Sequence, residues 1–208
     1  MSQAVEERCL ACAQALLAAL EGEPLKYKCL ITLAMFTGLR KGELVGLQWK
    51  DIDFTQLLLH VRRAAQIIAN KIVVGQPKRE SIRSVALSEE CASMLAEYQQ
   101  AQRVEAMRFD WVEGDWVFTQ GTGRIMYPTT PGQWLSKFLE RKGLEHMRFH
   151  DLRHFNASLL LAAGVDVVDT ASRLGHNSPA TTLRMYAHAL RDRDRQATDK
   201  LSALISPK

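Results

Sequence analysis

The sequence predicts a mainly helical α+β protein that forms a single domain over residues 1–208, with a small antiparallel sheet. Three observations lead to this class. Helix-length amphipathic segments occupy both ends of the chain, short β-rich segments lie between them, and no repeat or interdomain linker interrupts the 208 residues. With 47% hydrophobic residues, a chain of this length can bury one sizeable core.

Two helices are expected at the start of the chain, over residues 3–21 and from about Leu25 to Thr37. Ser2 stands at the N-cap position of the first helix, ahead of acidic residues in its early turns. Gly38 follows the second helix, and glycine readily adopts the left-handed conformation that ends a helix. A short helical turn is then expected in RKGELVGLQW.

In the middle of the chain the sequence pattern changes from that of helices to that of strands. The segments DIDFTQLLLHV, AAQIIANKIVV and SIRSVAL are short, rich in β-formers and joined by polar turns, which predicts the small antiparallel sheet. Ser88 then begins a long helix that runs to about Arg108, because serine is a preferred N-cap and two glutamates follow it. Residues 110–132 are expected to be a loop region with one short strand at WVF, and helices return after Thr130.

The last third of the chain is predicted to be helical. One helix covers His150–Ala163, and Asp166 caps another that ends at Gly175. Ser178 caps a third helix. The tail, residues 192–208, is an amphipathic helix with one apolar stripe.

Composition and charge exclude several classes of protein. No stretch reaches the ~18 apolar residues that span a bilayer, so we expect no membrane partner. Four scattered cysteines do not make a disulfide scaffold, which favours the reduced cytosol, and Cys9-x-x-Cys12 fits a buried helix face better than a redox or metal pair. The net charge of +4 lies in residues 141–208, where 11 Lys and Arg face 7 Asp and Glu. This basic third permits a polyanionic partner without requiring one.

The segment HDLRH carries the first candidate chemistry. His150 and Arg153 are three residues apart, so they share a face in the first turn of a helix, where unpaired N–H groups favour an anion. A forked guanidinium and an imidazole suit a phosphoryl group, although a solvated surface pair is the alternative interpretation. His150 and His154 also resemble the zinc pattern H-E-x-x-H. Asp151 is one methylene too short for the required glutamate, and Arg153 would set a cation beside the metal, so we expect no metal.

Four further residues are candidates only in combination. Arg40 directly follows the end of a helix, Lys78 lies in a turn between strands, and His176 follows a helix-ending glycine. Tyr186 lies about two turns into the next helix. Singly, the cations fit solvated surface charges and the tyrosine fits a half-buried aromatic residue.

The order of five segments is more specific than any one of them. TGLRKGEL, PKRESIRSVAL, HDLRH, LGH and TTLRMYAH together resemble the catalytic domain of the tyrosine recombinases, the integrases of phages and conjugative transposons and their relatives. The resemblance runs from about Leu25 to His188 and implies that family's catalytic-domain fold. It implies a catalytic set of Arg40, Lys78, His150, Arg153, His176 and Tyr186, with Glu43 as the supporting acidic residue.

One position departs from the family pattern within these segments. Arg79 stands after the lysine, where the family often has threonine, which leaves open whether Lys78 or Arg79 acts as the acid. The family's N-terminal core-binding domain is also expected to be missing from this chain, which would make it the catalytic part of a longer integrase.

The resemblance implies a site-specific DNA recombinase that cleaves and rejoins strands by transesterification through a 3′-phosphotyrosine, without metal, cofactor or ATP. Its role would be integration and excision of a mobile element. The implied partners are double-stranded DNA, three further copies in a homotetramer of the full-length protein, and accessory DNA-bending or directionality factors, in the bacterial cytoplasm. The tail helix is expected to pack on a neighbouring subunit or on its own core.

Two other functions remain open from the sequence. The same fold could relax DNA by strand rotation, as type IB topoisomerases do. Alternatively, the chain could be a DNA-binding module that uses its basic third without any chemistry.

Overall fold

A computed structural model describes residues 3–76, 82–109, 111–112 and 114–175 of the chain. Its helices are α1 (Gln3–Ala19), α2 (Leu25–Thr37), α3 (Lys41–Val45), the 3₁₀ turn η1 (Trp49–Asp51), α4 (Glu89–Arg108), α5 (Thr130–Lys142), α6 (Asp151–Ala162) and α7 (Val167–Leu174). Its strands are β1 (Ile52–Asp53), β2 (Leu58–Val61), β3 (Ala64–Ile68), β4 (Lys71–Gly75) and β5 (Arg83–Ala86). None of the helices described is long and apolar enough to cross a membrane.

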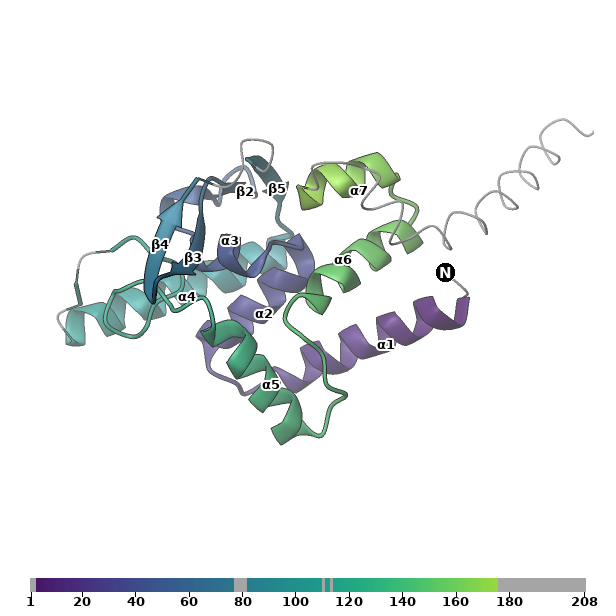
Figure 1. The fold of residues 1–208 in the computed structure, drawn as a ribbon, viewed down its shortest axis with the longest axis horizontal. Helices are drawn as coiled ribbons and strands as arrows, with labels where there is room; N and C mark the ends of the chain where they lie inside the picture. The colour runs from purple at the N-terminus through teal and green to yellow at the C-terminus, as the bar shows by residue number, and fades with distance from the viewer. Residues whose placement is uncertain (1–2, 77–81, 110, 113, 176–208) are drawn as a thin grey trace, which may run out of the picture.

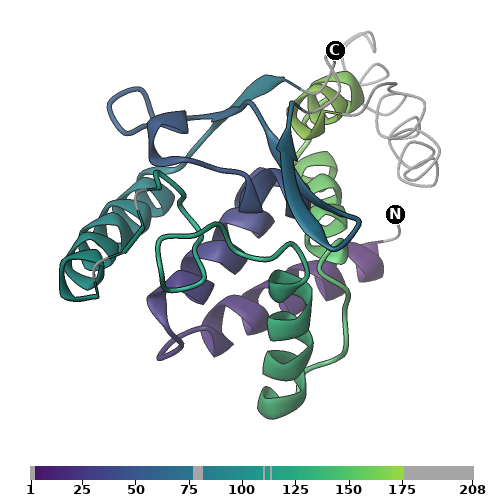
Figure 2. The ribbon, with the colours of Figure 1, turned by 60° about the vertical axis from the view of Figure 1, so that its left-hand side comes forward.

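Helix α2 is the centre of the core (Figures 1 and 2). It packs against α4 and α6, and α6 also packs against α1. Leu30, Ile31 and Leu33 on α2 are fully buried, because a helix that is apolar on nearly all sides is stable only inside a core. The segment that leaves α2, which contains Arg40, is therefore anchored at the middle of the molecule.

Several predicted helix ends are confirmed. Gly38 ends α2 with a φ of 63°, and Gly175 ends α7 with a φ of 66°. The Ser88 hydroxyl accepts a hydrogen bond from the backbone N–H of Cys91 at 3.3 Å, and the Asp166 carboxylate caps α7 through Val168 at 2.7 Å. These ends depend on neighbouring residues alone, so the sequence predicts them well.

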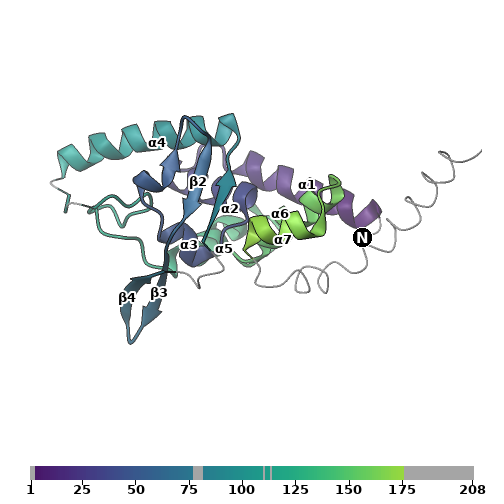
Figure 3. The same ribbon diagram turned by 90° about the horizontal axis from the view of Figure 1, so that it is seen from above.

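The predicted fold class, mainly helical with short antiparallel strands, is confirmed, although the strands form two small sheets rather than one. Strands β1, β2 and β5 make an antiparallel sheet, whereas β3 and β4 form a separate hairpin that projects from the body in Figure 3. The chain leaves the first sheet at Arg62 and Arg63, between β2 and β3. Both guanidinium groups approach the buried Asp51 carboxylate, at 3.7 and 2.5 Å.

The expected strand at WVF is also absent from the described residues, where Trp116 forms only an isolated bridge with Gln48. Val117 and Phe118 are fully buried, but the side-chain amide of Gln102 on α4 donates to the carbonyl oxygens of Trp116 and Val117, at 3.4 and 3.0 Å. A side chain thus takes acceptors that a neighbouring strand would otherwise use.

Smaller expectations also changed. Helix α1 ends at Ala19 rather than at residue 21, and Cys9 and Cys12 are half-buried rather than buried, because α1 is a peripheral helix. The expected caps Ser2 and Ser178 and the tail 192–208 lie outside the described residues.

Candidate active site

The structure describes four of the predicted site residues, which are Arg40, Glu43, His150 and Arg153. Lys78, His176 and Tyr186, together with the alternative acid Arg79, lie outside the described residues. The four described residues come from the start of α3 and the start of α6.

Arg40 and Glu43 form a capping box at the start of α3. The Arg40 backbone N–H donates to the Glu43 carboxylate at 2.9 Å, and Arg40 Nη1 donates to its other oxygen at 2.8 Å. The Glu43 side chain is only 2% exposed, whereas that of Arg40 is 38% exposed. Glu43 therefore holds both the backbone and the guanidinium group of Arg40, while the Arg40 side chain remains partly exposed.

Arg83 on β5 is a second arginine on the same carboxylate, and sequence reasoning missed it. Its Nη2 and Nη1 donate to the two Glu43 oxygens at 2.9 and 3.2 Å. A signal was available, because Arg83 lies two residues before the buried Val85 in a strand and therefore points to the same, interior face. Burial raises the pKa of Glu43, but the Arg83 hydrogen bonds and charge, with those of Arg40, lower it overall. Glu43 is ionised.

Arg40 and Arg83 also donate hydrogen bonds to carbonyl groups at the C-terminal end of α7. Arg40 Nη2 donates to the Gly175 carbonyl at 2.7 Å, and Arg83 Nε donates to the Arg173 carbonyl at 2.7 Å. Gly175 has the left-handed φ of 66°, and a Cβ at this position would lie 2.6 Å from Arg83 Nη1. Only glycine satisfies both conditions without displacement. The residue that follows it in the sequence is His176.

Arg153 is bound to the end of α2, just before Arg40 in the sequence. Its side chain is buried, with the residue 3% exposed, and Nη1 donates to the Gly38 carbonyl at 2.7 Å. One turn further along α6, the Asn156 amide donates to the carbonyl oxygens of Met35 and Phe36, at 2.8 and 3.0 Å. Helix α6 is thereby fastened to the end of α2, two residues before Arg40.

His150 lies at the N-cap of α6 and is exposed, whereas Arg153 is buried. Its ring meets that of His154 edge to face at 4.9 Å. Partial desolvation lowers the pKa of His150, and the positive charges of His154, Arg153 and Arg40 lower it further against the opposing Asp151. A neutral imidazole next to the arginines can accept a proton.

Asp151 has a structural partner. The Arg148 backbone N–H donates to its carboxylate at 2.7 Å, and Arg148 Nη2 donates at 3.0 Å. Partial burial raises the pKa of Asp151, but these contacts lower it overall. Among the residues the structure describes, no three His, Cys, Asp or Glu side chains gather where they could hold a metal ion.

The arginine charges are not cancelled locally. Arg173 on α7 donates to the carbonyl oxygens of Phe36 and Ala86, both at 3.1 Å, and its pKa is lowered by burial and then by the charge of Arg83. His150 is affected in the same direction by Arg153 and Arg40. Glu43 is shared between Arg40 and Arg83, so this group of three carries one excess positive charge. Such a place attracts an anion.

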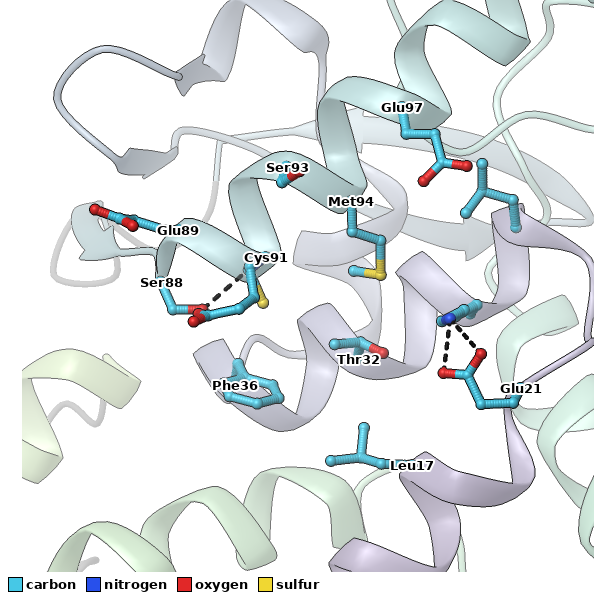
Figure 4. Close-up of a pocket in the computed structure, with 13 residues that line it drawn as sticks. Leu17, Glu21, Thr32, Phe36, Ser88, Glu89, Cys91, Ser93, Met94 and Glu97 are labelled. Carbon is cyan, nitrogen blue, oxygen red and sulfur yellow. Dashed lines mark hydrogen bonds and ion pairs between the residues drawn. The ribbon is translucent and has the colours of Figure 1, made fainter.

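A hollow with a volume of roughly 690 Å³ lies elsewhere, between α1, α2 and α4. Figure 4 shows side chains that line it, among which Leu17, Phe36 and Met94 are apolar. The lining also includes Glu21, Glu89, Glu90 and Glu97, against Lys28. Acidic side chains repel a phosphate backbone, and none of the predicted catalytic residues that the structure describes lines the hollow, so we place the candidate active site at the arginines.

The chain resembles several known proteins. Residues 11–193 match the phage integrase family. The ICEBs1 integrase of Bacillus subtilis is 31% identical over 88% of this chain and 50% of its own length. A tyrosine recombinase XerC-like protein of Caldanaerobacter subterraneus is 32% identical over 90% of this chain and 51% of its own. The chain thus spans about half the length of these curated relatives.

Solved structures show the same fold. The XerA recombinase superposes with a TM-score of 0.70 at 25% identity, over 89% of this chain and 62% of its own. The Tn1549 transposon integrase in complex with transposon right end DNA superposes with a TM-score of 0.77 at 21% identity, over 97% of this chain and 65% of its own.

Proposed function

This chain belongs to the phage integrase family and has the tyrosine recombinase catalytic-domain fold, and we propose that it cleaves and rejoins DNA strands in site-specific recombination. The observation that carries the proposal is the arginine site around Glu43. There, two guanidinium groups share one buried carboxylate, and Arg153 is fastened beside them. An excess of positive charge at that place fits the phosphodiester of a DNA backbone.

The reaction divides between groups that hold charge and groups that move protons. Arg40 and Arg153 bind the non-bridging oxygens of the phosphodiester and stabilise the charge that develops on them. The Tyr186 oxygen attacks the phosphorus while the bond to the 5′ oxygen breaks. His150 accepts the tyrosine proton, and Lys78 gives a proton to the departing 5′ oxygen.

The product is a 3′-phosphotyrosine and a free 5′-hydroxyl. Because one phosphodiester replaces another, no ATP is needed, and the arginines supply the charge that a metal would otherwise provide. Attack by a 5′-hydroxyl from a second DNA reverses the step and joins the strands. His176 is the remaining member of the proposed catalytic set, and the outcome is integration or excision of a mobile element.

Several partners belong to this proposal. Double-stranded DNA is the substrate, and structural neighbours include complexes with transposon right end DNA and with difH substrate. In the whole protein, four copies act together in the bacterial cytoplasm, with residues 192–208 of one copy packed on the next. Accessory DNA-bending or directionality factors complete the assembly.

The test is covalent capture. A pool of nicked duplexes with random sequence is incubated with residues 1–208, and protein–DNA adducts that survive denaturing detergent are recovered and sequenced. We expect adducts with the wild type and none with Tyr186→Phe, whose DNA affinity stays nearly unchanged because one hydroxyl contributes little to a phosphate-dominated interface.

The outcomes separate the candidate functions. DNA binding without any adduct would favour a binding module. Adducts accompanied by plasmid relaxation, without four-way junctions, would favour strand rotation. Adducts that persist in Tyr186→Phe would identify another nucleophile, with Tyr127 and Tyr98 the next to replace.

The role of Lys78 has a chemical test of its own. Replacement of the bridging 5′ oxygen with sulfur gives a thiolate leaving group, which needs no proton. We expect Lys78→Ala to cleave ordinary DNA very slowly and to regain most of its rate on the sulfur substrate, while Arg153→Ala regains little. An equal defect on both substrates would remove Lys78 from the chemistry and direct attention to Arg79 or His150.

A further inference from the structure

We propose that Arg83 is a positioning residue of the strand-cleavage reaction, which holds Arg40 through Glu43 and holds the end of α7 through the Arg173 carbonyl. The inference rests on the proposed function, since it assigns Arg83 a part in that same site. Arg83 itself need not touch DNA, because its side chain is only 8% exposed.

The contacts of Arg83 use all three of its guanidinium nitrogens. Nη1 and Nη2 donate to the two oxygens of Glu43, at 3.2 and 2.9 Å, and Nε donates to the Arg173 carbonyl at 2.7 Å. A planar fork engaged on two sides is fixed in orientation as well as position. Lysine has a single charged nitrogen, so it cannot bind the Glu43 carboxylate and the Arg173 carbonyl in the same way at once.

The first consequence concerns the charge of Arg40. Glu43 is buried, so its negative charge needs compensation inside the protein. With Arg83 present, that compensation is shared, and Arg40 keeps part of its charge for an incoming phosphate. Without Arg83, the carboxylate would bind Arg40 alone and compete with the phosphate for it.

The second consequence concerns the end of α7. The last carbonyl groups of a helix lack partners within the helix and carry its negative dipole end. Arg83 takes the Arg173 carbonyl, and Arg40 takes the Gly175 carbonyl at 2.7 Å. The two arginines thus cap α7 from segments that are 90 and 135 residues away in sequence. The cap fixes the position of Gly175, the residue that precedes His176 in the sequence.

A double-mutant cycle tests this role. Single-turnover cleavage rates at saturating protein would be measured for Arg83→Met, Glu43→Gln and the double variant, on a duplex recovered by covalent capture. We expect Arg83→Met to cleave about 10²-fold more slowly, a loss typical of a small misplacement of catalytic groups, with DNA affinity changed by less than about threefold. The double variant should be no slower than the slower single variant, because both changes break the same connection from Arg83 through Glu43 to Arg40.

Arg63→Met is the matched control, since Arg63 also pairs with a buried carboxylate, Asp51. It should lower the melting temperature but leave the cleavage rate of folded protein within about twofold of the wild type. Arg83→Lys keeps the charge and loses the fork, so it should fold and cleave at an intermediate rate. It carries the test if Arg83→Met does not fold.

The outcomes are distinct. Wild-type rates in Arg83→Met or Arg83→Lys, multiplicative defects in the double variant, or an equal rate loss in Arg63→Met would overturn the role of Arg83 while leaving the proposed function intact. If the wild type itself forms no adduct with any duplex, the proposed function fails instead.

Discussion

Glu43 and Asp51 are buried carboxylates held in closely similar ways. Each is the third residue of a short helix, α3 or η1, and each accepts a 2.9 Å hydrogen bond from the backbone N–H of the residue before that helix. Each is also shared by two arginines. We refer to Glu43 with Arg40 and Arg83 as the Glu43 clamp, and to Asp51 with Arg62 and Arg63 as the Asp51 clamp.

The two clamps differ in the distance over which they act. In the Asp51 clamp both arginines come from the stretch between β2 and β3, only 12 residues away for Arg63. In the Glu43 clamp Arg83 comes from 40 residues away, and both arginines continue to carbonyl groups at the end of α7. A local clamp directs the path of the chain, whereas a long-range clamp assembles groups from separate elements into a site.

The largest expected contrast between the clamps is in chemistry. Arg40→Ala and Arg153→Ala should each slow strand cleavage by ~10² or more, because each removes a donor that stabilises developing charge. Arg63→Ala should leave the rate of the folded protein nearly unchanged. Single-turnover formation of the covalent adduct measures all three variants. A comparable loss in Arg63→Ala would show that the two clamps do not differ in function.

The second contrast is in stability. Glu43→Gln leaves Arg83 buried without its counter-charge and should lower the free energy of unfolding by about 3 kcal/mol. Asp51→Asn should cost only about 1 kcal/mol, since the side chains of Arg62 and Arg63 are 50% and 19% exposed and can turn toward water. Urea denaturation at pH 7 compares the two variants.

The pH dependence of the Glu43 effect has a definite sign. The pKa of Glu43 is lowered in the folded protein, so its contribution is present above the ordinary carboxyl pKa of about 4.3 and is lost as the pH falls through the folded value. The difference between wild type and Glu43→Gln should therefore shrink below about pH 4. A difference that persists at lower pH would argue against an ionised Glu43.

The smallest expected effect concerns the pKa of His150, which partial desolvation and then the positive charges near the Glu43 clamp lower. Because the pKa of His150 is lowered, the acid limb of the cleavage rate should have its midpoint below the ordinary value of about 6.5. His154→Gln removes one of the charges responsible and should move that midpoint upward, whereas Arg63→Ala should leave it in place. Rates measured between pH 5 and 8, with NMR titration of the His150 ring, test this. A midpoint above 6.5 in the wild type would exclude His150 as the base.

Local features of the fold could be predicted from the sequence. The glycine that ends α2, the serine that begins α4 and the aspartate that caps α7 act through residues within four positions of themselves. The motif that contains Arg40 and Glu43 is likewise local, and the structure confirms that the two side chains meet.

Features that depend on distant residues were missed. The chain passes from one sheet to the other at Arg62 and Arg63, which pair with Asp51, and no strand pattern reveals this contact. Arg83 could have been suspected from its inward position beside Val85, but its partner on α3 could not. Asn156 was not noticed at all, because its partners at the end of α2 lie 120 and 121 residues earlier.

The attachment of Arg153 to the Gly38 carbonyl, across 115 residues, has a consequence for synthesis on the ribosome. Chains emerge with the N-terminal part first, so α2, α3 and β5 leave the ribosome well before α6 and α7. Until residue 175 has emerged, Arg40 and Arg83 have no carbonyl groups to cap, and Arg153 has not reached Gly38. A nascent or truncated chain can therefore carry Arg40 and Arg83 while these long-range contacts, and the arrangement of the candidate site around them, are still missing.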